Sequence, residues 1–148
     1  YGIDPDFYKT KDIHIHATEA AVPKDGPSAG VTMVTGLVSA LTGRKIKNTV
    51  AMTGEVTIRG RVLAIGGLNE KTMAAYRSGV KTVILPKKNL PDLEDIEPKV
   101  KEALEFVLVD NVSEVLKIAL LPEENVKEEK AATMIYSRNS ATSHVAHV

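Results

Sequence analysis

Segments with the residue pattern of β-strands alternate with segments of helical periodicity along most of this chain. Residues 12–17 alternate polar and apolar side chains with a period of two, which predicts a strand with Ile13 and Ile15 on one face. A loop with two prolines follows, and from Ser28 apolar residues recur at helical spacing until Gly43. Repeated alternation of this kind favours a sheet covered by helices over a helical bundle or a β-sandwich. We therefore predict an α/β (α+β) fold with a mixed sheet.

The same patterns predict the other elements of the fold. Further strands are expected at 48–58, 62–65, 81–85 and 105–110, and further helices at 68–77 and 112–121. The first two of these strands form a hairpin around Arg59-Gly60-Arg61, and a short helix lies between the last two. Gly66-Gly67 ends the hairpin, and Ser78-Gly79 ends the helix that follows it. The chain therefore enters helices at two junctions, one at Ser28 and one at Gly66-Gly67.

Length and composition indicate one domain followed by a tail. The chain has 148 residues, which is enough for one hydrophobic core and too short for two domains of ordinary size. From Pro122 onward a charged run gives way to Ser, Thr, Asn and His without a clear period. We predict a single domain at 1–121 and a disordered tail at 122–148.

Charge and cysteine content argue against several classes of function. The 19 basic residues balance 19 acidic ones, so the chain lacks the positive field that attracts nucleic acid or anionic membranes. With no Cys, it has no disulfide, no thiolate nucleophile and no Cys-ligated metal, which suits a reducing compartment. It contains no apolar run of the roughly 18 residues that cross a bilayer, and no signal-peptide pattern at its start. We expect a cytoplasmic domain that binds neither nucleic acid nor membrane.

Ser28 is the strongest candidate nucleophile. It stands between small residues in Gly26-Pro27-Ser28-Ala29-Gly30, at a loop-to-helix junction where backbone amides can hold an oxyanion. A plain helix N-cap is the alternative, because Ser is favoured there. The same five residues match the nucleophile elbow of α/β-hydrolases, which requires a strand before the Ser and a His after it. Here a proline-rich loop precedes Ser28 and the later histidines, His144 and His147, lie in the predicted tail, so a Ser-His-acid triad lacks its base.

Lys71 is the best candidate for the base that a Ser nucleophile needs. It falls in the first turn of the helix predicted at 68–77. Burial of its stem and the positive end of the helix dipole would both disfavour the charged ammonium form, leaving an amine that can accept a proton. An exposed surface Lys is the alternative, because Lys is rarely buried. The spacing alone does not choose between the two.

Two blocks of the sequence resemble the proteolytic domain of the bacterial Lon proteases. Residues 23–30, Pro-Lys-Asp-Gly-Pro-Ser-Ala-Gly, resemble the active-site signature of that family. Residues 51–63 and 65–68 are similar to the segment that leads to its catalytic Lys, and Lys71 falls at that position. The likeness extends over about 1–121. It implies a Lon proteolytic-domain-like fold and a serine endopeptidase activity.

The resemblance also implies roles for individual residues. Ser28 would be the nucleophile and Lys71 the general base of a dyad that cleaves peptide bonds through an acyl-enzyme. Thr53, which shares the family's Thr-Gly-Glu element with Glu55, is expected to hydrogen-bond the Lys71 amine. Asp25 is expected to pair with the Lys or to occlude the site. A plain strand residue and an Asx turn are the alternatives for Thr53 and Asp25.

His14 and His16 match family histidines on the strand that leads to the active-site loop. Two His at this spacing share one strand face, so a metal pair is the alternative, although we expect no metal here.

Some positions depart from the family pattern. Residues 17–21 read Ala-Thr-Glu-Ala-Ala where the family usually has Val-Pro-Glu-Gly-Ala, so the loop before the signature is expected to differ. Ala64 replaces a common Pro and Asn69 a common Lys, which should alter stiffness or charge more than mechanism. The family has further strands upstream, so we expect one edge of the sheet to be missing or supplied elsewhere.

The motor that the family couples to proteolysis is not encoded in these residues. No Gly-x-x-x-x-Gly-Lys-Ser/Thr phosphate loop occurs, so no cofactor is expected in this chain. The resemblance implies a separate ATPase module that binds ATP and Mg, a homo-hexameric ring and unfolded protein substrates. A catalytically silent oligomerisation or scaffold domain of the same fold is the alternative.

Overall fold

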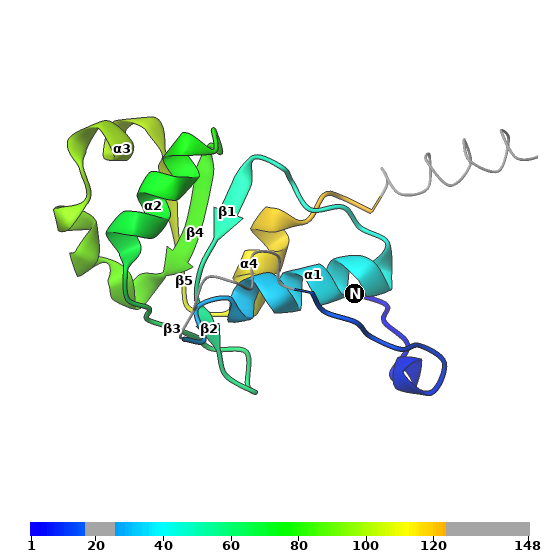
Figure 1. Cartoon of the computed structure of the whole chain (residues 1–148). Helices are drawn as coiled ribbons and strands as arrows, with labels where there is room; N and C mark the ends of the chain where they lie inside the picture. Colours follow the sequence, from blue (N-terminus) through cyan, green and yellow to red (C-terminus); the bar gives the residue numbers. More distant parts are fainter. Residues whose placement is uncertain (17–25, 124–148) are drawn as a thin grey trace, which may run out of the picture.

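A parallel three-stranded sheet forms the centre of the molecule (Figure 1). The structure is a computed structural model, and it describes residues 1–16 and 26–123. The strand order in this sheet is β1 (Val50–Met52), β4 (Thr82–Pro86), β5 (Glu105–Val109). A separate antiparallel hairpin joins β2 (Glu55–Val56) to β3 (Val62–Leu63). The predicted α/β class is confirmed, with the parallel and antiparallel pairings placed in two different sheets.

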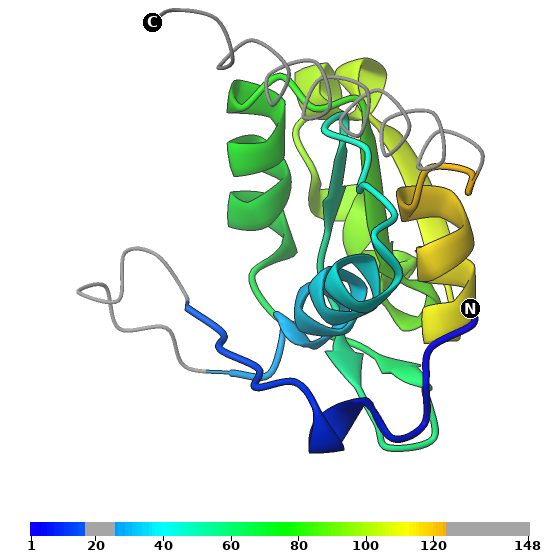
Figure 2. The same cartoon turned by 90° about the vertical axis from the view of Figure 1, so that its right-hand side faces the viewer.

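Helices cover both faces of the parallel sheet. The α-helices among the described residues are α1 (Gly30–Thr42), α2 (Leu68–Arg77), α3 (Pro98–Ala103) and α4 (Val112–Ala119). Short 3-10 helices are η1 (Phe7–Lys9), η2 (Lys87–Asn89) and η3 (Pro91–Asp95). In Figure 2, α2 and α4 stand on opposite sides of the strands. The molecule is therefore layered as helix, sheet and helix.

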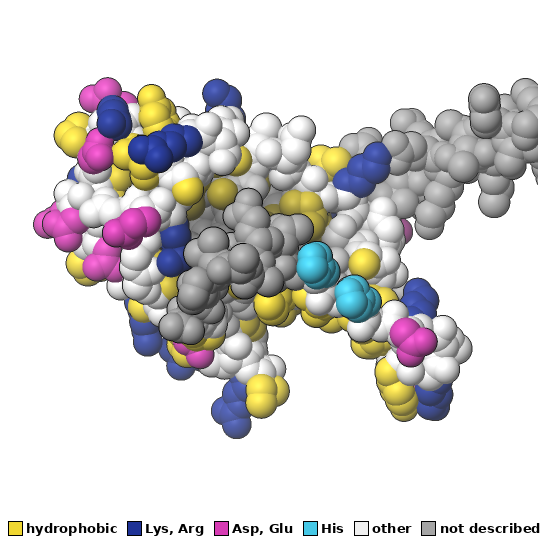
Figure 3. All heavy atoms as spheres, viewed as in Figure 1, with side chains coloured by type: hydrophobic (Ala, Val, Ile, Leu, Met, Phe, Trp, Pro, Cys, Tyr) yellow, Lys and Arg dark blue, Asp and Glu magenta, His cyan; other side chains and the backbone are white. Residues whose placement is uncertain are grey.

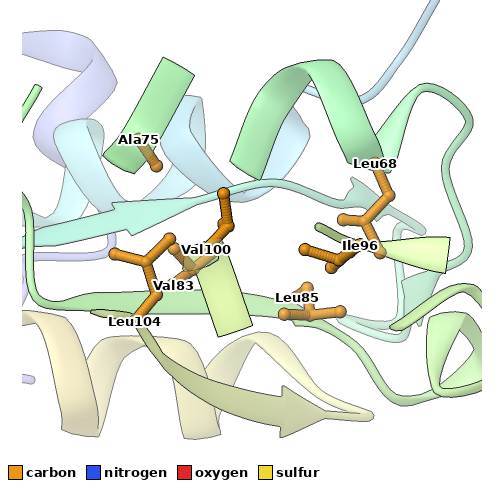
Figure 4. Close-up of a cluster of buried hydrophobic side chains, with 7 residues drawn as sticks. All are labelled: Leu68, Ala75, Val83, Leu85, Ile96, Val100 and Leu104. Carbon is orange, nitrogen blue, oxygen red and sulfur yellow. The ribbon is translucent and has the colours of Figure 1, made fainter. Parts of the chain in front are cut away.

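The alternation of side chains along β4 produces two cores, one on each face of the sheet. Val83 and Leu85 point into a cluster completed by side chains of α2, α3 and their flanking loops (Figure 4). Ile84 points to the other face, where its cluster includes Val31 of α1 and Val115 of α4. Burying one such aliphatic side chain stabilises a fold by about 1.5–3 kcal/mol. The two clusters hold α1 and α2 against opposite faces of the strands.

Glycines set the helix boundaries that matter for the site. α1 ends at Gly43, which takes a left-handed conformation with φ of 71°. α2 begins after Gly67, with φ of 67°, and its observed bounds match the predicted helix at 68–77. The predicted hairpin is also confirmed, with Val56 opposite Val62. These local signals were sufficient because a change of backbone direction needs a residue that tolerates it.

The strand predicted at 12–17 is wrong for the part that the structure describes. Residues 12–16 belong to no strand, and Ala17 lies outside the described residues. Ile13 and Ile15, the supposed buried face, are 47% and 58% exposed. A period of two becomes a strand only when a neighbouring strand accepts and donates its backbone hydrogen bonds, and none of the described strands does so. The pattern alone could not supply that partner.

The predicted strand at 48–58 is interrupted. β1 ends at Met52 and β2 starts at Glu55, with Thr53-Gly54 between them. The break turns the chain from the parallel sheet into the hairpin and places Thr53 beside α1.

The predicted tail falls outside the described residues from position 124 onward.

Candidate active site

Ser28 lies in the turn that precedes α1. The helix begins at Gly30, and its N-cap is Ala29, which makes no side-chain capping hydrogen bond. The alternative reading of Ser28 as a helix N-cap is therefore wrong. The hydroxyl of Ser28 is one residue too early to serve the helix.

The backbone of Ser28 is docked onto the segment between β1 and β2. The Gly54 amide donates to the Ser28 carbonyl at 2.8 Å, and the Thr53 hydroxyl donates to the same oxygen at 3.3 Å. The Val31 amide returns a bond of 3.0 Å to the Gly54 carbonyl. Gly30 makes this contact possible, because a Cβ there would lie 2.9 Å from the Val56 amide nitrogen. Close backbone approach therefore requires a glycine two positions after Ser28.

One finding limits where an oxyanion could bind at this junction. The Gly30 amide already donates to the Pro27 carbonyl at 3.0 Å, and the Val31 amide donates to Gly54. Helix N-terminal amides stabilise an oxyanion only when they are free to point at it. Any oxyanion donor here must therefore be an amide other than those two.

Lys71 is half-buried in the first turn of α2, at the predicted junction. Its Nζ donates a hydrogen bond of 2.8 Å to the Gly66 carbonyl, so the side chain folds back over the turn that starts its own helix. A Cβ built on Gly67 would lie 3.4 Å from that Nζ. The amine therefore lies directly beside Gly67. Lys71 is therefore partly exposed, and its amine has a backbone partner in the turn.

Ser28 and Lys71 border one open pocket of about 400 Å³. Thr53 lines it as well, and the rest of the lining is dominated by small side chains from α1, β1 and α2. The pocket is bounded by Ala29, Thr32, Ala51, Met52, Ala74, Ala75, Ser78 and Val80 in addition. Two residues far apart in the sequence therefore line the same pocket. An extended polypeptide backbone could enter such an open, weakly polar depression.

The hydrogen bonds around the predicted dyad differ from those implied by the family resemblance. Thr53 was expected to bind the Lys71 amine, but its hydroxyl binds the Ser28 carbonyl and the amine binds Gly66. Of the hydrogen bonds between described residues, none joins the Ser28 hydroxyl to the Lys71 amine. Ser28 and Lys71 thus line one pocket without a hydrogen bond between their side chains. Catalytic hydrogen bonds are often formed only when substrate binds.

The other predicted site residues lie elsewhere or outside the described chain. Asp25 is not among the described residues. Glu55 sits in β2, half-buried and opposite Leu63, and does not line the Ser28 pocket. His14 and His16, the cyan side chains of Figure 3, are exposed and border a separate depression over α1. Among residues 1–16 and 26–123, no three acidic, His or Cys side chains are grouped as metal ligands.

Asn89 is a residue near the site that the sequence did not single out. It is 1% exposed, at the end of η2. Its Oδ1 accepts from the Ile65 amide at 3.1 Å, and its Nδ2 donates to the Ile65 carbonyl at 2.8 Å. Asn before Leu-Pro reads as an ordinary turn signal, so the sequence contained no clue to its partner.

The chain is similar to Lon proteases over most of its length. A family model described as the Lon protease (S16) C-terminal proteolytic domain matches residues 1–122. The Lon protease of Clostridium acetobutylicum is 59% identical over 121 residues, which are 82% of this chain. That of Finegoldia magna is 61% identical over 120 residues, or 81% of this chain, and Lon protease 1 of Bacillus subtilis is 58% identical over 123 residues, or 83%. The matched region spans only 16% of the length of each of these curated relatives.

Proposed function

Because the chain belongs to the family of Lon protease C-terminal proteolytic domains and is therefore a serine-type peptidase domain, we propose that Ser28 and Lys71 form its catalytic dyad. One observation supports this assignment above the others. Two separate loop-to-helix junctions, at the starts of α1 and α2, each contribute one of these two residues to the lining of the same pocket. A Ser nucleophile with a Lys base requires such a meeting.

In the proposed reaction, the Ser28 Oγ attacks the carbonyl carbon of a peptide bond while a neutral Lys71 amine accepts the hydroxyl proton. The amine first leaves the Gly66 carbonyl and turns across the shared pocket. The protonated amine then gives its proton to the leaving nitrogen, which breaks the peptide bond and leaves an acyl group on Ser28. Water then attacks the ester carbon while the amine accepts a proton from it. The bond to Ser28 Oγ breaks, the amine returns the proton to Oγ, and the acyl product leaves as a carboxylic acid.

We further propose that this domain works as part of a longer protein. The relatives that it matches are about six times as long as the matched region, since that region is 16% of each of them. By analogy we assign the whole protein an ATPase module that binds ATP and Mg, a homo-hexameric ring, unfolded protein substrates and a cytoplasmic location. In the part of the chain that the structure describes, no helix is both long and apolar enough to cross a bilayer.

Two substitutions test the dyad. Lys71→Ala should lower the rate of cleavage of an unstructured polypeptide by at least about a hundredfold, the usual contribution of an acid-base group. Ser28→Ala removes the nucleophile itself and should lower the rate at least as much. Ser28→Ala should also abolish labelling by a serine-directed fluorophosphonate. Ser113→Ala and Lys117→Ala, at exposed positions of α4, are the matched controls and should keep wild-type rates. Retention of turnover in either dyad variant would refute the assignment.

The role of a motor module is tested separately. Cleavage of short unstructured peptides should need only this domain in its assembled form, whereas cleavage of a folded protein should need the extended protein and ATP hydrolysis. If the extended protein degrades a folded substrate equally well without ATP, the proposed motor is wrong while the dyad stands.

The scaffold and α/β-hydrolase alternatives make different predictions. A silent scaffold would assemble without labelling at Ser28, which the fluorophosphonate assay detects. An α/β-hydrolase would need a His after the nucleophile, so deletion of the chain beyond Pro122 should abolish its activity. Under our proposal that deletion leaves peptide cleavage intact.

A further inference from the structure

The side chain of Asn89 is held in a single orientation. Its Nδ2 faces two acceptors, the Ile65 carbonyl and the Asp92 carboxylate, and its Oδ1 faces the Ile65 amide. Exchange of the amide oxygen and nitrogen would place like groups against each other at all three contacts. The buried amide therefore has one stable orientation, and Ile65 receives both hydrogen bonds that a neighbouring strand would otherwise provide.

Ile65 immediately precedes the Gly66-Gly67 turn, which accepts a hydrogen bond from the Lys71 amine. The peptide group between Ile65 and Gly66 is fixed by Asn89, and the next carbonyl, that of Gly66, accepts from Lys71 Nζ at 2.8 Å. On the other side of the turn, the Lys71 amide donates to the Gly67 carbonyl at 3.3 Å. Two consecutive glycines have wide conformational freedom unless both ends of their turn are held. Asn89 holds the upstream end.

We propose that Asn89 is a positioning residue for the base of the reaction. It acts through the backbone at Ile65 and Gly66 and keeps the Gly66 carbonyl where the Lys71 amine can rest beside the pocket of Ser28. This inference relies on the proposed Ser28–Lys71 dyad. It adds that the amine is placed by a buried amide from η2, an element that contributes nothing to the pocket lining.

The chemistry of this site explains why Asn is suited to it. Ala would leave the Ile65 amide and carbonyl without their partners. Asp would keep an acceptor for the Ile65 amide, lose the donor to the Ile65 carbonyl, and set a second carboxylate against Asp92. Both changes release the upstream end of the turn. Misplacement of a reacting group by about 1 Å can slow an enzyme by about a hundredfold.

The test uses whichever form of the protein shows Ser28-dependent turnover. In Asn89→Asp we expect kcat and the rate of fluorophosphonate labelling of Ser28 to fall by about tenfold to a hundredfold, with little change in KM. The NMR amide signals of Gly66 and Gly67 should shift and broaden. Asp92 is exposed and accepts from the Asn89 amide, so Asp92→Ala should lower kcat and labelling in the same direction but by less.

Asn111 provides the matched control. Its Oδ1 caps α4 by accepting from the Ser113 amide at 2.9 Å, away from the Ser28 pocket. Asn111→Asp makes the same atomic change as Asn89→Asp and should retain wild-type kcat. Asn111→Ala removes a helix cap, so it shows whether a loss of stability alone lowers kcat. If Asn89→Asp and Asp92→Ala both keep wild-type kcat and labelling, the inference fails while the dyad stands. If Ser28→Ala or Lys71→Ala remains active, the dyad itself fails.

Discussion

The hydroxyl of Thr53 donates a hydrogen bond to the carbonyl oxygen of Ser28, a residue 25 positions earlier in the chain. The Gly54 amide binds the same oxygen. The turn that carries the proposed nucleophile is thus anchored to the connection between β1 and β2. This relationship assigns the Thr-Gly-Glu element a role in placing Ser28.

Thr53→Val tests this role, because it removes the hydroxyl and nearly preserves the shape of a side chain that is 7% exposed. The net loss of one hydrogen bond should lower the free energy of unfolding by about 1 kcal/mol. Peptide cleavage by this variant should also be slower, because the turn that carries Ser28 loses one of its two anchoring hydrogen bonds. Thr35→Val is the control, since that buried hydroxyl bonds only within α1, to the Val31 carbonyl at 2.7 Å. Equal cleavage rates in the two variants would show that Thr53 has no special role.

Gly30→Ala should destabilise the domain. The added methyl carbon would lie 2.9 Å from the Val56 amide nitrogen and 3.2 Å from the Gly54 carbonyl oxygen, and backbone atoms cannot easily move aside. We expect a loss of about 1–3 kcal/mol in urea unfolding, which is typical of overpacking. Gly36→Ala in the same helix meets nothing within 4 Å and should stabilise it by about 0.5–1 kcal/mol. The same sign for both variants would contradict the close approach.

Gly67→Ala should affect both stability and catalysis. Gly67 has φ of 67°, which costs a residue with a side chain about 1–2 kcal/mol. Its new methyl carbon would also contact Lys71 Nζ at 3.4 Å and crowd the Glu70 carboxylate at 3.3 Å. Gly79→Ala has a similar φ of 73° with nothing within 4 Å, so it should share the loss of stability and keep the activity. Thermal unfolding and peptide cleavage, measured on both variants, separate the two effects.

Leu85→Ala should be among the most destabilising single changes in the domain. Leu85 is fully buried between β4 and the α2–α3 layer (Figure 4), and truncation of such a Leu costs about 2–5 kcal/mol. Leu90→Ala removes the same atoms from a side chain that is 53% exposed, and its effect should be small. Chemical denaturation with a common slope for the two variants measures the difference. A similar loss for both would mean that this cluster is not the core.

Local signals predicted much of the fold. The bounds of α2 were predicted correctly because Gly66-Gly67 and Ser78-Gly79 interrupt a run of good helix formers. The β2–β3 hairpin followed from two β-branched runs separated by Arg59-Gly60-Arg61. In each case the residues that determine the conformation are adjacent in the chain. Ser28 and Lys71 became candidates from their positions at two helix starts, and the family resemblance then implied their pairing.

Local sequence signals did not predict which distant residues would pair or form hydrogen bonds. The extended segment at 12–16 has a strand pattern without a strand to pair with, and the Thr53 hydroxyl reaches Ser28 instead of Lys71. Asn89 looked like a turn residue until its amide was seen to hold Ile65. Side-chain alternation and glycine positions act through the backbone of their own segment, whereas a hydrogen bond between distant segments depends on how the whole sheet and its helices pack. Residue types and spacing thus made Ser28 and Lys71 candidates, the family resemblance implied their roles, and packing determined which neighbours hold them in place.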